Sequence, residues 1–134
     1  MTRRDLDNLR EMHRQRRSIL DRIERLQTQV ERTSPNLDGM PHGGQQKDLM
    51  AEYAANLDDA LRIMAELEQR LSIMIEGIEQ EIRTAQLPSR QTAIIWMRYA
   101  EGKTIGQIGH ELHYSRPWVY QQYKKAMETL FPKV

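Results

Sequence analysis

The 134-residue sequence contains no cysteine, few aromatic residues and no long apolar run. Without cysteine, the chain cannot be a disulfide scaffold, a thiol enzyme, an iron–sulfur protein or a cysteine-ligated zinc protein. No stretch of about 18 apolar residues predicts a transmembrane helix. The first residues, Met-Thr-Arg-Arg, do not lead into the apolar segment of a signal peptide. We therefore expect an intracellular protein, in the cytoplasm and without a membrane partner.

The net charge is only +1, but it is unevenly distributed. Residues 88–134 carry seven Lys/Arg and three Asp/Glu, a net +4, whereas residues 1–87 carry thirteen and sixteen, a net −3. A basic C-terminal third favours an anionic partner.

Glycine and proline are scarce, and they divide the chain into helical segments. Residues 33–46 hold two prolines and three glycines, so no helix is expected to cross them. Pro88 marks the next break and Pro117 a later one. No segment alternates like a strand, so the pattern predicts an all-α protein.

Two long helices are predicted before Pro88, over residues 3–32 and 47–86, joined by a loop at 33–46. Apolar residues follow a 3-4 spacing in both, which is typical of a coiled coil. In the first helix these positions are Leu9, Met12, Arg16, Ile19, Ile23, Leu26 and Val30; in the second they are Met50, Tyr53, Leu57, Ala60, Met64, Leu67, Leu71, Met74, Ile78, Glu81 and Ala85. Residues 1–86 are therefore predicted to form a long antiparallel hairpin.

The second apolar stripe is wider and longer than the first helix can cover. Leu61, Ile63, Ile75 and Ile82 widen it. A strip left exposed would be an apolar patch that soluble monomers rarely tolerate. We expect this strip to join two copies into a dimer through Met64, Leu67, Leu71, Met74, Ile75 and Ile78.

After Pro88 the spacing predicts a trihelical helix-turn-helix domain, residues 87–134. A helix over 89–101 is followed by Gly102, and Thr104 with Gln107 forms a capping box for a short second helix. Gly109 is expected where the helices cross, and His113 in a left-handed turn. Ser115 then caps a third helix, residues 116–130.

The third helix carries the candidate DNA-binding residues on the side opposite its apolar face. Arginine, glutamine and lysine have the donors that guanine, adenine and phosphate accept. Trp118 has two interpretations: it contacts DNA, or it packs against Trp96 or the N-terminal helices. The full set is Ser115, Arg116, Trp118, Gln121, Gln122, Lys124 and Lys125.

The order of motifs after residue 86 resembles region four of sigma-70-type factors. The resemblance is carried by Leu87-Pro88-Ser89-Arg90-Gln91, Arg98-Tyr99-Ala100-Glu101-Gly102, Gln107-Ile108-Gly109-His110-Glu111-Leu112 and Ser115 with Val119, Ala126 and Leu130. The whole chain is similar to phage-encoded late-gene regulators of the ArpU and RinA type. This similarity implies a transcriptional regulator, an activator of phage late genes in a bacterial host, with RNA polymerase as a further candidate partner.

Other interpretations of the function remain open from the sequence. A small terminase subunit, which packages DNA, also joins a helix-turn-helix to helical oligomerisation segments, and some such motifs dock proteins without binding DNA. Arg14, Arg16 and Arg17 form either a salt-bridged face or a second nucleic-acid site. His110 and His113, three residues apart, are expected to serve the scaffold helix and the turn rather than to bind a metal ion. No catalytic residues, cofactor or metal are predicted.

Overall fold

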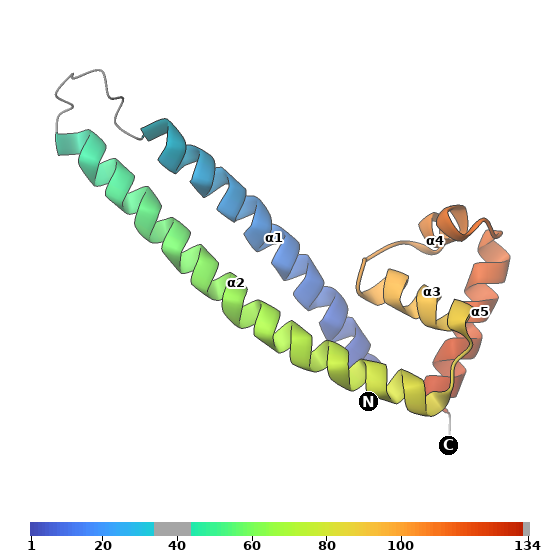
Figure 1. The fold of residues 1–134 in the computed structure, drawn as a ribbon. Coiled ribbons are helices and arrows are strands. Elements are labelled where there is room, and N and C mark those ends of the chain that lie inside the picture. Colours follow the sequence, from blue (N-terminus) through green and yellow to red (C-terminus); the bar gives the residue numbers. More distant parts are fainter. Residues whose placement is uncertain (34–43, 133–134) are drawn as a thin grey trace. The chain divides into compact units, whose positions relative to one another are not determined.

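The computed structural model describes residues 1–33 and 44–132, and within these ranges the chain is helical, without strands. The helices are α1 (Arg3–Thr33), α2 (Gly44–Ala85), α3 (Ser89–Tyr99), α4 (Ile105–Leu112) and α5 (Arg116–Leu130) (Figure 1). The all-α fold with a helical hairpin before a helix-turn-helix is thereby confirmed.

Some predicted boundaries need correction. The loop expected at 33–46 falls largely on residues 34–43, which lie outside the described residues. Its two ends are helical instead, because Thr33 closes α1 and Gly44 opens α2. Helix α3, predicted over residues 89–101, ends at Tyr99 rather than at Glu101. Gln86 follows α2 with a positive φ of 55°, which stops the helix before Leu87.

The described chain forms two compact units. Residues 15–69 make one, here called the arm unit, and residues 1–14 with 70–134 make the other, here called the C-terminal unit. The division into residues 1–86 and 87–134 stays a prediction.

The arm unit is an antiparallel pair formed by parts of α1 and α2. Its core brings Ile23 and Leu26 of α1 against Ala60 and Met64 of α2, with Ile19, Leu20 and Leu57 packed around them. Arg16, the polar residue in the predicted apolar spacing, reaches across to Glu68 with Nη2 3.1 Å from Oε1. One of the three arginines of the predicted basic patch is therefore an interhelical ion-pair residue.

The apolar strip that we expected to be exposed on α2 is mostly buried within the single chain. Met64, Leu67, Leu71 and Ile78 are 7% exposed or less, while Met74 and Ile75 are half-buried. The dimer surface predicted from the sequence was therefore wrong, because most of its residues are buried within one chain. The large apolar side chains that remain exposed on α2 are instead Leu49, Leu61, Ile63 and Ile73.

The start of α1 belongs to the C-terminal unit. Leu6 and Leu9 are completely buried in this unit. Three residues from the second half of α2, Leu71, Ile78 and Ile82, are nearly completely buried in the same unit. The Met1 ammonium lies 3.6 Å from the Glu81 carboxylate. Burial of α1 residues in this unit indicates that the C-terminal core extends beyond the three short helices.

None of the helices in the described part of the chain is long and apolar enough to cross a lipid bilayer.

Candidate DNA-binding surface

The core of the C-terminal unit holds α3, α4 and α5 together. One side chain from each helix, Ile94, Ile108 and Val119, is completely buried. Partly buried residues pack around this cluster: Met97, Ile105, Leu112, Tyr114, Trp118 and Tyr123. This core determines which side of α5 faces solvent.

Two polar contacts further restrict the rotation of α5 against α3. The side-chain amide of Gln91, a residue that is 8% exposed, donates to the side-chain oxygen Oε1 of Gln122 at 3.1 Å. The hydroxyl groups of Tyr99 and Tyr123 also share a hydrogen bond. Burial raises the pKa of Tyr99 well above its usual value, and the bond to Tyr123 raises it further. Both contacts tie buried polar groups to partners, as such groups require.

The connection into α4 follows local capping rules. Gly102 has a φ of 69°, the left-handed conformation that glycine adopts without steric cost. The Thr104 hydroxyl accepts from the Gln107 backbone N–H at 3.2 Å, and the Gln107 side chain accepts from the Thr104 N–H at 2.9 Å. The predicted capping box is therefore confirmed. Lys103 lies 2.8 Å from Glu101 and 2.5 Å from Glu111, and these two hydrogen bonds raise its pKa.

The turn between α4 and α5 depends on two residues predicted from the sequence. A Cβ atom built on Gly109 would lie 2.7 Å from the Tyr114 carbonyl oxygen and 3.6 Å from Val119 Cγ2. His113 has φ 62° and ψ 41°, and the Tyr114 N–H then donates to the Gly109 carbonyl at 2.9 Å. The close crossing at Gly109 and the left-handed His113 are both confirmed.

Helix α5 begins at a serine cap. The Ser115 hydroxyl accepts from the Trp118 N–H at 3.4 Å, and Pro117 occupies the first turn, where a missing N–H has no intrahelical partner to lose. Ser115 and Arg116 themselves are exposed. The guanidinium of Arg116 extends over Gly106 of α4, where a Cβ would come within 2.7 Å of it. Arg116 thus lines a hollow shared with Lys103, Gln107 and His110.

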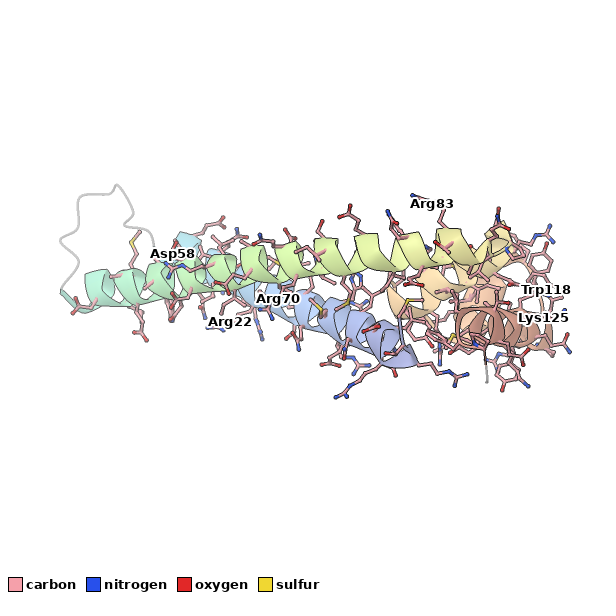
Figure 2. The ribbon with its side chains drawn as sticks, turned by 90° about the horizontal axis from the view of Figure 1, so that it is seen from below. Arg22, Asp58, Arg70, Arg83, Trp118 and Lys125 are labelled. Carbon is pink, nitrogen blue, oxygen red and sulfur yellow. The ribbon has the colours of Figure 1, made fainter. Side chains whose placement is uncertain are left out.

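The exposed side of α5 carries three of the remaining candidates. Gln121, Lys124 and Lys125 are exposed, whereas Gln122 is half-buried and bonded to Gln91. Lys125 and Trp118, seven residues apart, project from the same side of the helix (Figure 2). The Lys124 ammonium lies 5.6 Å from the centre of the Tyr120 ring.

Two of the three aromatic residues on α5, Trp118 and Tyr120, differ in a way that the sequence did not reveal. Trp118 is half-buried and stacks on Tyr114, with ring centroids 3.9 Å apart and planes inclined by 18°. Trp118 therefore packs on Tyr114 and on the Ile94–Ile108–Val119 cluster, whereas the sequence had suggested Trp96 or the N-terminal helices as its packing partners. The Arg90 guanidinium lies 5.1 Å from the Tyr114 ring centre. Tyr120, which we did not single out, is 51% exposed beside Gln121. Its spacing of four from both Arg116 and Lys124 was the available signal.

Comparison with known proteins gives a family match for the C-terminal helices. Residues 85–131 match the model of sigma-70 region 4, a DNA-binding family rather than an enzymatic one. Searches of curated proteins and of solved structures returned no match. The match begins two residues before Leu87 and covers α3, α4 and α5 in full. Residues 85–131 therefore form a helix-turn-helix similar to sigma-70 region 4, a family whose members bind DNA.

Proposed function

We propose that this protein binds double-stranded DNA sequence-specifically, with the first half of α5 in the major groove, and thereby regulates transcription. The observation that carries the proposal is the strip of polar and aromatic side chains on the exposed side of α5, while the opposite side lies in the core. The strip comprises Arg116, Tyr120, Gln121 and Lys124. A major groove is wide enough to admit one such helix.

Each side chain of this strip has a chemical task on DNA. Gln121 can donate to and accept from the edge of an adenine, and Arg116 can donate twice to a guanine. Tyr120 offers an aromatic surface to a thymine methyl group and a hydroxyl to a phosphate. Lys124 and Lys125 neutralise phosphates, which contributes affinity without sequence preference.

The other candidates act by positioning the helix in this proposal. Gln122 holds α5 against α3 through Gln91, so we assign it no base contact. Ser115 caps α5, and its hydroxyl hydrogen can still donate to a phosphate. Trp118 supports the first turn through its stack on Tyr114.

The regulatory role that we propose is activation of phage late genes, in the cytoplasm of a bacterial host. The resemblance of the whole chain to ArpU- and RinA-type regulators supports it, and the family match supports its DNA-binding part. RNA polymerase is the proposed protein partner, since a sigma-like domain placed on a promoter lies within reach of it.

Selection of bound DNA from a random pool tests the proposal directly. We expect enrichment of one sequence by the full chain, and loss of preference at defined positions with Gln121→Ala. Gln80→Ala, an exposed glutamine on α2 in the same unit, is the matched control and should select the same sequence. A wild-type protein that enriches no sequence would contradict specific binding.

A further inference from the structure

The arm unit has a small core for its length. The buried cluster consists of four side chains, two from each helix, with three partly buried ones around them. Leu61 and Ile63, by contrast, are 46% and 45% exposed on α2. Helices in water gain most of their stability from packing an apolar face. A two-helix arm with exposed apolar residues can therefore bury more apolar surface against a further partner.

One side of the arm carries an apolar residue between charges of both signs. Arg22, Asp59, Ile63 and Glu66 each directly precede a buried residue, namely Ile23, Ala60, Met64 and Leu67. Successive residues are about 100° apart around a helix. In an antiparallel pair, the positions directly before the buried residues of both helices lie on the same side of the pair. We call these four residues, together with Arg25 before the buried Leu26, the arm face.

The arm face places its opposite charges at one level along the pair. Ile23 shares a core cluster with Ala60 and Met64, so Arg22 lies level with Asp59 and Ile63. Arg22 projects outward from α1 (Figure 2). Among residues 1–33 and 44–132, neither Arg22 nor the two acidic residues of the face makes an ion pair.

The two helices of the arm also carry opposite net charge. Residues 15–33 hold five arginines and three acidic residues, a net +2, whereas residues 44–69 hold two basic and six acidic residues, a net −4. Arg16 and Glu68 already join the basic helix to the acidic helix inside one chain. The same complementarity is available between two chains.

We propose that the arm face binds the arm face of a second copy of this chain. A two-fold axis running along the arm places α1 of each copy against α2 of the other at the same level. Arg22 then reaches the partner's Asp59 and the partner's Glu66, and this contact occurs twice per dimer. Ile63 becomes buried beside the partner's Ile63. A face that is apolar at its centre and carries both signs of charge complements itself under this symmetry.

The pairing is independent of the proposed function, because it is measured without DNA. It adds to that function by supplying two linked DNA-binding units, which raises avidity by roughly 10²–10⁴ where two half-sites fit.

Charge reversal tests the proposal through solution mass, measured by light scattering or sedimentation at micromolar concentration. The wild-type chain of 15.9 kDa should appear at twice that mass. Arg22→Glu alone, and Asp59→Arg with Glu66→Arg in another chain, should each appear as monomers, because like charges then meet in the homodimer. An equimolar mixture of the two variants should restore the dimer, since both contacts become attractive.

Two controls accompany the mass measurement. Glu24→Arg, an exposed residue of α1 that directly follows the buried Ile23 and so lies off the arm face, should leave the dimer intact. Ile63→Arg should give a monomer with unchanged helical circular dichroism. A monomeric wild-type chain, a ring of many subunits as in a terminase, or a variant mixture that stays monomeric would each overturn the proposal.

Discussion

The three described glycines inside helices allow the helix crossing to be tested by one substitution at three sites. A Cβ on Gly109 would meet a backbone oxygen, that of Tyr114, at 2.7 Å. A Cβ on Gly106 would meet the far end of Arg116, which can move, and a Cβ on Gly77 would meet nothing within 4 Å. The same added methyl group therefore encounters a rigid obstacle, a flexible one or open space.

The expected changes in unfolding free energy follow from these distances. Alanine in a helix is favoured over glycine by about 1 kcal/mol, so Gly77→Ala should stabilise the protein by about that amount. At Gly109 the same gain is offset by overpacking of about 1–3 kcal/mol, because the α4–α5 turn must shift. We expect a net loss of up to about 2 kcal/mol for Gly109→Ala. Gly106→Ala should leave stability close to that of Gly77→Ala but displace Arg116 and weaken DNA binding.

Thermal unfolding followed by tryptophan fluorescence is the appropriate assay. Both tryptophans, Trp96 and Trp118, lie in the C-terminal unit and report its unfolding. A change of 1 kcal/mol corresponds to roughly 4 °C in Tm for a chain of this size. Gly109→Ala should melt several degrees below the wild type and Gly77→Ala a few degrees above. If Gly109→Ala melted with or above Gly77→Ala, which gains the same helix propensity without an obstacle, our account of the turn would be wrong.

Three further predictions concern the turn, the DNA surface and alkaline pH. His113→Val should cost about 1–2 kcal/mol in thermal melts, because a β-branched residue resists positive φ, whereas His113→Gly should cost none; equal melting would refute the left-handed geometry. Lys124→Ala should weaken binding to all DNA sequences and lower the slope of log affinity against log salt by about one unit, whereas Gln121→Ala should cost about 1–3 kcal/mol on the selected site only; gel shifts over a salt series separate the two effects. Tyr99 has a folded pKa raised above the unfolded value of 10.0, so its contribution to stability is full below pH 10 and is lost as the pH rises further. Tyr99→Phe should therefore lose less stability between pH 9 and 11 than the wild type does, and parallel curves in denaturant titrations would contradict this.

Local rules in the sequence determined the helices, their caps and the turn. Thr104 with Gln107, Ser115, Gly109 and His113 were each predicted in the role that they adopt. These roles rest on interactions between residues three to six apart, or on the conformational preference of a single residue, so neighbouring sequence suffices to predict them. The apolar spacing likewise predicted several buried positions, among them Leu9, Ile23 and Leu26 of α1 and Ala60 of α2, whereas Leu6 is buried outside the spacing and Glu81 within it is exposed.

Packing between distant segments determined which side chains at the edge of a helix face are buried and which are exposed. From the sequence, Gln122 was expected to contact DNA, Trp118 either to contact DNA or to pack inward, and Tyr120 was not singled out. All three lie near the edge of the apolar face of α5. The stack on Tyr114 and the hydrogen bond from Gln91, 31 residues away from Gln122, turn the first two inward and leave Tyr120 outside.

The apolar strip of α2 shows the same limit. Its width indicated a second chain, yet most of it is buried within one chain, and Leu6 and Leu9 of α1 lie in the same compact unit as the C-terminal helices. Periodicity shows that a helix face is apolar, but not which segment covers it. That choice depends on contacts between residues far apart in the chain, and only the tertiary structure determines them.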